Sequence, residues 1–536
     1  MRPALRLAVP LGLLLALAAC GGGGSDDGGT PPLPTPPGRV SIPSPVVAGC
    51  GLGGSGTAFV NAEVEPMLAR HPTQPALLAA TWQQDRWSDG AARALVSAVS
   101  EDGGSTWRHT LHPFSRCGGA SAGSAGDFDR ATDPWADIGS DGVLHLMSLS
   151  TTGGVFGSGS RNAMLASRSL DAGRTWSVPL VLQQDGSGAF NDKNTLTVDT
   201  LDPAFVYATW DRLVPGGRGP TMLARSTDAG LSWEPARAIH DPLPPSPGGS
   251  AQTLGNRIAV VPAGPHRGTL VNVFTQIEAG TSGTVNNTVR VMRSADRGLS
   301  WSVPVVVADH RGIGARDPAT GTPIRDGALI PSIAAAPDGT LWLAWQDSRF
   351  SGGVRDAIAV VRSSDGGQTW STPVAASSSG TAAAFTPTLH VRDDGLVGLL
   401  YFDLRPDTAD AGTLLAAVWL ATTRDGLAWS ETAVWNPFDL TLAPNARGLF
   451  LGDYMGMASS GTRFLPLVAL SGGDPSNRTD VYLLPTPPAA AAAASAGRGR
   501  ALIVDDAAFN AQRTAFTQRV MERRVPGWSR WAGLAR

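Results

Sequence analysis

Four segments of the chain place an aspartate and an arginine directly after an apolar run. They contain Asp85 with Arg86, Asp211 with Arg212, Asp347 with Arg349, and Asp403 with Arg405. A guanidinium offers two parallel hydrogen bonds to a carboxylate, so converging arginines would suit recognition of an anionic ligand. The same side chains could instead brace neighbouring strands as structural ion pairs, and the sequence leaves both interpretations open.

A second group of polar residues opens or closes other apolar runs. Its members are Glu65, Asp133, Asp137, Asp192, Lys193 (the only lysine), Arg257, Gln276, Glu278, Asp453 and Tyr454. If the fold joins both groups at one rim, we expect the substrate-binding residues to be Arg86, Arg212, Arg257, Arg349, Arg405, Asp85, Asp347 and Asp403. Histidine-rich metal spacings, Cys-x-x-Cys pairs and phosphate-binding Gly-Lys-Ser/Thr loops are missing from the sequence. We therefore expect no metal and no cofactor, although a structural cation in an Asp-rich loop stays open.

The elements that must position these residues are repeated. Five segments follow the pattern Ser-x-Asp-x-Gly-x-Ser/Thr-Trp, and a sixth is degenerate; each is called a box below. The boxes end in Trp107, Trp176, Trp233, Trp301, Trp370 and Trp429. Self-similarity at a nearly fixed period indicates stacked or radially arranged units. Apolar runs before each box and a short extended piece after it give four strands per unit, as in a propeller blade.

Each box has a local explanation that involves no catalysis. Glycine permits positive φ in a hairpin turn, the aspartate accepts hydrogen bonds from the turn, and the tryptophan covers apolar surface. Strands of a blade alternate in direction. The boxes should therefore lie on the face opposite the Asp and Arg segments.

The number of units suggests an all-β propeller over residues 40–484. Three further runs, 451–458, 464–470 and 480–484, carry no box, and residues 40–47 could supply their missing fourth strand. We therefore predict seven blades and keep six as the alternative if one unit is irregular.

The boxes resemble the Asp boxes, or BNR repeats, of sialidases. This resemblance implies an exo-acting glycoside hydrolase with Tyr454 as nucleophile, Glu278 as its partner and Asp89 as acid/base. A neutral tyrosine suits a substrate that carries a carboxylate at the reacting carbon, since a carboxylate nucleophile would be repelled.

One departure from that family concerns the substrate. Sialidases open their first blade with a motif whose arginine holds the substrate carboxylate, whereas this chain has Glu63-Val64-Glu65-Pro66 there. We therefore weigh two hypotheses, a sialidase-like hydrolase of a glycan or glycoconjugate and a non-catalytic surface propeller that binds glycans or proteins. The first is our working hypothesis.

The first 20 residues resemble a bacterial lipoprotein signal peptide whose lipobox ends in Leu17-Ala18-Ala19-Cys20. The resemblance implies export, lipidation of Cys20 and anchoring to the cell envelope, and Gly21 favours the outer membrane. Residues 21–39 would form a Gly- and Pro-rich tether. In an oxidising compartment Cys50 and Cys117 could pair, or they could remain free thiols.

Charge and composition limit the other possibilities. A formal net charge of -3 argues against a nucleic-acid partner, and we expect a monomer. Residues 485–500 are an Ala- and Pro-rich linker, and residues 501–536 form a basic tail with one predicted helix. That helix could dock on a partner or a membrane surface, but we favour a solvated tail.

Overall fold

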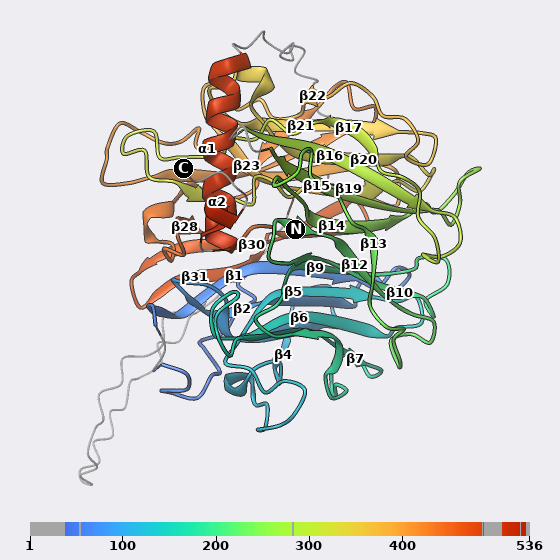
Figure 1. The fold of residues 1–536 in the computed structure, drawn as a ribbon. Coiled ribbons are helices and arrows are strands. Elements are labelled where there is room, and N and C mark those ends of the chain that lie inside the picture. Colours follow the sequence, from blue (N-terminus) through green and yellow to red (C-terminus); the bar gives the residue numbers. More distant parts are fainter. Residues whose placement is uncertain are drawn as a thin grey trace, which may run out of the picture. The chain divides into compact units, whose positions relative to one another are not determined.

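The computed structural model describes residues 38–52, 55–280, 284–484, 486, 506–525 and 527–531. The predicted signal peptide, Cys20, most of the tether and most of the linker lie outside the described residues. The described part is predominantly β-structure, with a helix near its C-terminal end (Figure 1).

The strands form successive antiparallel units, which agrees with the predicted strand alternation. The first three units are β1 (Ala58–Arg70), β2 (Leu78–Trp87), β3 (Ala92–Ser100) and β4 (Arg108–His112); β5 (Arg130–Ile138), β6 (Leu144–Thr152), β7 (Arg161–Ser169) and β8 (Leu180–Asp185); and β9 (Phe190–Val198), β10 (Val206–Leu213), β12 (Thr221–Ser226) and β13 (Arg237–His240). The next three are β14 (Ser250–Val260), β15 (Leu270–Ala279), β16 (Val285–Ser294) and β17 (Val305–Asp309); β19 (Ser332–Ala335), β20 (Leu341–Asp347), β21 (Ala357–Ser363) and β22 (Val374–Ala375); and β23 (Ala384–Val391), β24 (Val397–Asp403), β25 (Leu415–Thr423) and β26 (Ser430–Ala433).

A further unit joins the two ends of the strand series. It contains β29 (Gly456–Ser460), β30 (Arg463–Asp474) and β31 (Asn477–Leu483), and Arg39 bridges to Tyr482 beside β31. The backbone N–H of Val40 donates to the carbonyl of Val481 at 2.7 Å. The first strand of each unit contacts the first strand of the next, and β29 contacts β1, so the contacts form a closed cycle.

Short elements complete the described fold. They are β11 (Arg218–Gly219), β18 (Ile324–Arg325), β27 (Phe438–Asp439), β28 (Leu449–Phe450), η1 (Arg116–Gly118), η2 (Ser348–Ser351) and η3 (Leu440–Leu442). Strands β18 and β28 pair in parallel and bring two segments distant in sequence together. A disulfide joins Cys50 to Cys117 with Cα atoms 5.7 Å apart, so the segment before β1 is tied to η1.

The repeated turns have the hydrogen bonds that their sequence predicts. In the first box, the carboxylate of Asp102 accepts from the backbone N–H of Thr106 at 2.9 Å and from its hydroxyl at 2.6 Å. The same pair of bonds recurs at Asp171, Asp228, Asp296 and Asp365. These carboxylates are fully used within their turns, which supports a structural role.

Several first strands carry a bulge with an unusual backbone conformation. Glu65, Asp133, Lys193 and Thr386 have φ between 50° and 53°, and each lies where strand register shifts. Non-glycine residues rarely occupy this left-handed region, and such strain commonly occurs at functional sites. The bulges therefore mark these first-strand positions as candidate site residues.

Helix α1 (Asp506–Arg524) and the short α2 (Trp528–Trp531) pack against the β-units. Phe516, Met521, Val525 and Trp528 are buried against residues of units three to five, including Leu254 and Leu329. The expectation of a solvated tail was wrong, because the tail buries Phe516, Met521 and Trp528 against the β-units. Among the described residues, no helix is long and apolar enough to span a membrane.

Candidate functional site

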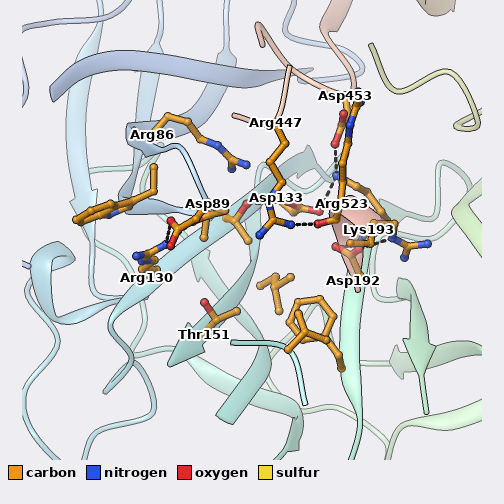
Figure 2. Close-up of a pocket in the computed structure, with 18 of the residues that line it drawn as sticks. Arg86, Asp89, Arg130, Asp133, Thr151, Asp192, Lys193, Arg447, Asp453 and Arg523 are labelled. Atoms are coloured by element: carbon orange, nitrogen blue, oxygen red, sulfur yellow. Dashed lines mark hydrogen bonds and ion pairs between the residues drawn. The ribbon is translucent and has the colours of Figure 1, made fainter. Parts of the chain in front are cut away.

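A cavity of about 730 Å³ opens where the first strands of several units meet helix α1. Its walls come from the starts of β5 and β9, the ends of β2, the loops 325–330 and 447–453, and the last turn of α1 (Figure 2). Many charged side chains line it, among them Arg86, Asp89, Arg130, Asp133, Asp192, Lys193, Arg325, Arg447, Asp453, Arg523 and Arg524.

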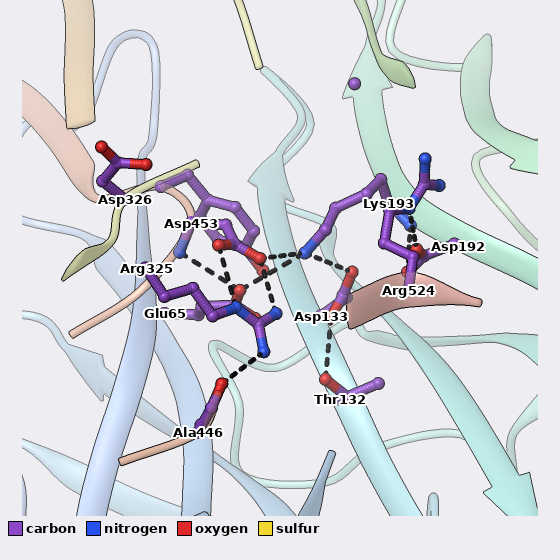
Figure 3. Close-up of polar contacts among 12 residues, drawn as sticks. Glu65, Thr132, Asp133, Asp192, Lys193, Arg325, Asp326, Ala446, Asp453 and Arg524 are labelled. Atoms are coloured by element: carbon purple, nitrogen blue, oxygen red, sulfur yellow. Dashed lines mark hydrogen bonds and ion pairs between the residues drawn. The ribbon is translucent and has the colours of Figure 1, made fainter. Parts of the chain in front are cut away.

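A buried charge cluster forms one side of the cavity (Figure 3). The ammonium of Lys193 lies 2.6 Å from the Asp453 carboxylate, 3.3 Å from Asp133 and 3.5 Å from Glu65. Arg325 also binds Asp453, at 2.8 Å. Three of these residues are those whose bulges give them positive φ, so the strained backbone places their side chains together.

The carboxyl groups of the cluster have pKa values shifted in different directions. Burial would raise the pKa of Asp453, but Arg325 and Lys193 hold it well below its usual range. Burial also opposes ionisation of Asp133, yet Lys193 and the Thr132 hydroxyl keep its pKa below the ordinary value. For Glu65, burial outweighs the attraction of Lys193 and raises the pKa to about 8. The cluster thus contains two stable carboxylates and one carboxyl group that can exchange a proton near neutral pH.

Three arginines at the cavity have no carboxylate partner among the described residues. Arg86 donates to the side-chain oxygen of Gln83 at 2.6 Å and stacks over Phe450, and Arg447 donates to the backbone carbonyl of Arg523. The guanidinium of Arg523 lines the cavity without an ion pair in the described part of the chain. Burial and the nearby charge of Arg325 lower the pKa of all three, to about 10 for Arg86. Clustered guanidiniums with spare donors are suited to an anion.

Asp89 is the only one of the three predicted catalytic residues that lines this cavity. Its carboxylate accepts from Arg130 at 2.6 Å and from the Ser55 hydroxyl at 3.1 Å. Its side chain is 31% exposed, so a ligand in the cavity can reach it.

Tyr454 lies beside a second, much smaller cavity that it shares with Lys193, Arg257 and Asp453. Its hydroxyl donates to the carbonyl of Pro134 at 2.9 Å, and its ring packs on Trp135. Burial raises the pKa of Tyr454 well above its ordinary value. The phenol is therefore held in the protonated form and away from the main cavity.

The structure does not bring Glu278 to Tyr454. Glu278 ends β15, accepts from Gln276, and pairs with Arg290 at 3.0 Å within its own sheet. It lines neither of the two cavities. The predicted arrangement of Tyr454, Glu278 and Asp89 around one substrate is thus corrected by the geometry.

The expected convergence of arginines is also corrected, since only Arg86 of the predicted set reaches the main cavity. Each of the others has a local partner: Arg212 pairs with Asp185, Arg349 with Asp347, and Arg405 with Asp403 and Glu431, while Arg257 lies over Trp135 beside the small cavity. Asp85 is buried and pairs with Arg93 at 2.8 Å. For most of the four segments, the bracing interpretation describes the observed contacts.

Sequence reasoning found one of the eight cavity arginines, Arg86, and missed Arg93, Arg116, Arg130, Arg325, Arg447, Arg523 and Arg524. Arg325 ends the short strand β18 and Arg447 lies in a loop, both without a repeat signal, and Arg523 and Arg524 belong to the helix that was expected to be solvated. Within the described residues, no group of three or more His, Cys, Asp or Glu could hold a metal ion.

Comparisons with known proteins give a fold but no family. No family model matches the chain, and no curated protein matches it. Among solved structures, an ulvan lyase, described as a new family of polysaccharide lyase, is similar with a TM-score of 0.51, 13% identity, and coverage of 80% of this chain and 95% of that chain. A Hadza microbial sialidase has a TM-score of 0.41, 16% identity and 76% coverage of both chains. An α-L-arabinanase of Penicillium chrysogenum has a TM-score of 0.39, 14% identity, and coverage of 66% of this chain and 92% of that chain.

Proposed function

We propose that this protein is a carbohydrate-active enzyme that cleaves an acidic saccharide in the main cavity. The observation that carries the proposal is the set of three arginines, Arg86, Arg447 and Arg523, that face the cavity without a carboxylate partner among the described residues. The cavity volume of about 730 Å³ is that of a small-molecule site. The fold similarity to an ulvan lyase supports the carbohydrate class.

The arginines would hold a carboxylate or sulfate group of the saccharide, because each offers paired N–H donors to such a group. Asp89, the exposed carboxylate of the same cavity, would transfer the proton at the bond that breaks. The buried cluster of Lys193, Asp133 and Asp453 would keep this side of the cavity rigid. In hydrolysis a water adds across the glycosidic bond. In elimination the C5–H and C4–O bonds of a uronate both break, the electron pair of the C5–H bond forms the C4=C5 double bond, and the proton lost from C5 balances the proton gained by the leaving C4 oxygen.

The sialidase-like form of this proposal requires Tyr454 as nucleophile. The contact of its hydroxyl with the Pro134 carbonyl and its position outside the main cavity weigh against that role. We therefore propose a cleavage that does not depend on Tyr454. Tyr454→Phe should retain activity, whereas Asp89→Asn should lose most of it.

We also propose that the closed cycle of units is a seven-bladed Asp-box propeller, and that Cys20 is lipidated and anchors an exported, monomeric protein to the cell envelope. Fractionation of cells expressing the Cys20→Ser variant tests the anchor. The variant should leave the membrane fraction; retention there would contradict the proposed lipidation.

The test of activity uses detergent-solubilised full-length protein and a panel of uronate-containing and sulfated oligosaccharides with neutral counterparts. New reducing ends report cleavage, and ultraviolet absorbance of an unsaturated uronate distinguishes elimination from hydrolysis. Cleavage of acidic members, reduced by Arg86→Gln and Arg447→Gln, is expected. Binding of acidic members without any product would contradict the proposed enzyme activity. It would favour the alternative function, a propeller that binds glycans without cleaving them. The separation of Tyr454 from Glu278 and Asp89 is the observation that favours this alternative.

A further inference from the structure

The last turn of helix α1 forms part of the cavity wall. Val520, Arg523 and Arg524 line the cavity together with residues of the β-units. The helix enters the site from the far C-terminal part of the chain, about 70 residues after Asp453 in sequence. Figure 2 shows Arg523 beside Arg447 and opposite the Asp89 side of the cavity.

Arg524 attaches the last turn of α1 to the third β-unit. Its guanidinium binds Asp192 at 2.6 Å and Asp211 at 2.9 Å, and all three side chains are at most 10% exposed. Burial alone would lower the pKa of Arg524, but the two aspartates raise it. Removing one partner of such a buried group leaves uncompensated charge, so this contact strongly favours one docked position of the helix.

Apolar packing holds the rest of the helix in place. Phe516 and Met521 are buried on one side of α1, and Val525 and Trp528 continue the same contact beyond its end. Arg513, about ten residues before the cavity turn, donates to Asn286 at 3.1 Å and does not line the cavity. The helix is therefore anchored along its length, and Arg523 is placed without needing an acidic partner of its own.

Arg523 lies among other guanidiniums, and the acids that act on it, Asp326 and Asp453, form no ion pair with it among the described residues. Arg325 and Arg447 lie nearby, and of these three guanidiniums only Arg325 has an ion pair among the described residues. Burial and Arg325 together lower the pKa of Arg523. A partly buried cluster of like charges is destabilising unless an anion joins it. The helix C-terminus offsets part of that repulsion, because its dipole favours cations.

We propose that the C-terminal helix completes the ligand site, with Arg523 as a specificity-determining residue for the anionic group of the saccharide and Arg524 as the residue that positions it. The inference rests on the proposed function and deepens it, since it names the element that selects acidic over neutral ligands. The ligand group is a carboxylate or a sulfate.

Sulfate alone is the probe for this inference. Full-length protein is titrated with sodium sulfate at constant ionic strength, and the saturable part of the rise in unfolding temperature gives an apparent Kd. Non-specific stabilisation by sulfate is not saturable and is common to all variants. Hydrogen exchange over residues 506–525 measures docking of the helix independently of any activity.

Arg523→Gln should weaken sulfate binding about 10- to 100-fold, the loss expected for a charge-assisted hydrogen-bonded contact, while exchange in the helix stays slow. Arg523→Lys should recover part of the affinity. Arg513→Gln, with the same charge change on the same helix, should leave the affinity unchanged. Arg524→Met should speed exchange over the last turn and weaken sulfate binding together.

Unchanged sulfate affinity in Arg523→Gln with the helix still protected would overturn the inference, as would the absence of any saturable sulfate effect in the wild type. Product formation from acidic saccharides separates the two proposals. If Arg523→Gln cleaves acidic saccharides as the wild type does, the enzyme proposal stands and the role of the helix fails.

Discussion

Lys193 is the residue whose replacement tests the buried charge cluster most directly. Its ammonium contacts the carboxylates of Asp453, Asp133 and Glu65, and it is 7% exposed. In Lys193→Met, a side chain of similar length remains, but among the described residues only Arg325 still forms an ion pair with these acids, and Arg86 acts on them without contact. Breaking a buried pair by removing one partner costs about 3–5 kcal/mol, and we expect a loss of that size at pH 8.

The loss should depend on pH, because the acids left behind can take up protons. Without Lys193 their pKa values rise in the folded state, so the folded variant binds more protons than the unfolded chain and gains relative stability as pH falls. Urea unfolding of wild type and variant at pH 5 and pH 8, with equal m-values, gives the two differences in stability. The difference should shrink clearly at pH 5.

Arg174→Met is the control for this experiment. Arg174 pairs with Glu101 at the surface, with both side chains about half exposed, and such pairs contribute about 0–1 kcal/mol. An equal loss for Lys193→Met at pH 5 and pH 8 would refute the electrostatic reasoning and leave packing as the cause.

Three further changes have defined outcomes. The raised pKa of Glu65 lets the folded state hold a proton that is lost as pH rises between about 4.5 and 8, so the free energy of unfolding falls by at most about 1.4 kcal/mol per pH unit. Glu65→Gln should remove this contribution and make the free energy of unfolding depend less on pH. Identical pH slopes for wild type and variant in urea titrations would contradict this. Trp528→Ala removes a fully buried side chain, which typically costs about 3–5 kcal/mol, so limited proteolysis should cut within residues 506–525 sooner than in wild type; equal resistance would argue against tight docking. Replacing Cys50 and Cys117 by serine opens a loop of 67 residues and should lower the free energy of unfolding by roughly 2–4 kcal/mol, and an unchanged urea midpoint would speak against the disulfide.

The parts of the fold with local signals were predictable from sequence. The boxes were recognisable because Asp102 and its equivalents satisfy the turn with neighbours no more than four residues away. The alternation of apolar residues located the strands. Residues 40–47 were predicted to supply a fourth strand; residues 39–41 do contact β31, but residues 42–47 form no strand. Lys193 and Asp453 were also singled out, since charged residues at strand starts are conspicuous.

The site was harder to predict, because two residues on one extended segment can satisfy each other. Arg349 closes back on Asp347, and Arg405 on Asp403, so neither guanidinium needs a ligand. The closeness of each arginine to its aspartate in sequence suggested a binding site. The same closeness lets the two side chains pair with each other, so neither arginine is available to a ligand. Arg86 ends β2 and was predicted, whereas Arg447, Arg523 and Arg524 come from a loop and from α1, where neither spacing nor periodicity indicates a destination.

The docking of α1 has a consequence for how the protein matures. The cavity wall includes Val520, Arg523 and Arg524, which follow all of the β-units in the chain, and Arg524 ties them to Asp192 and Asp211 of the third unit. A chain still being synthesised therefore has no complete cavity until α1 has been made, however well its β-units have folded. A chain truncated before Asp506 would keep its cycle of strands but lack the part of the cavity wall that Val520, Arg523 and Arg524 supply.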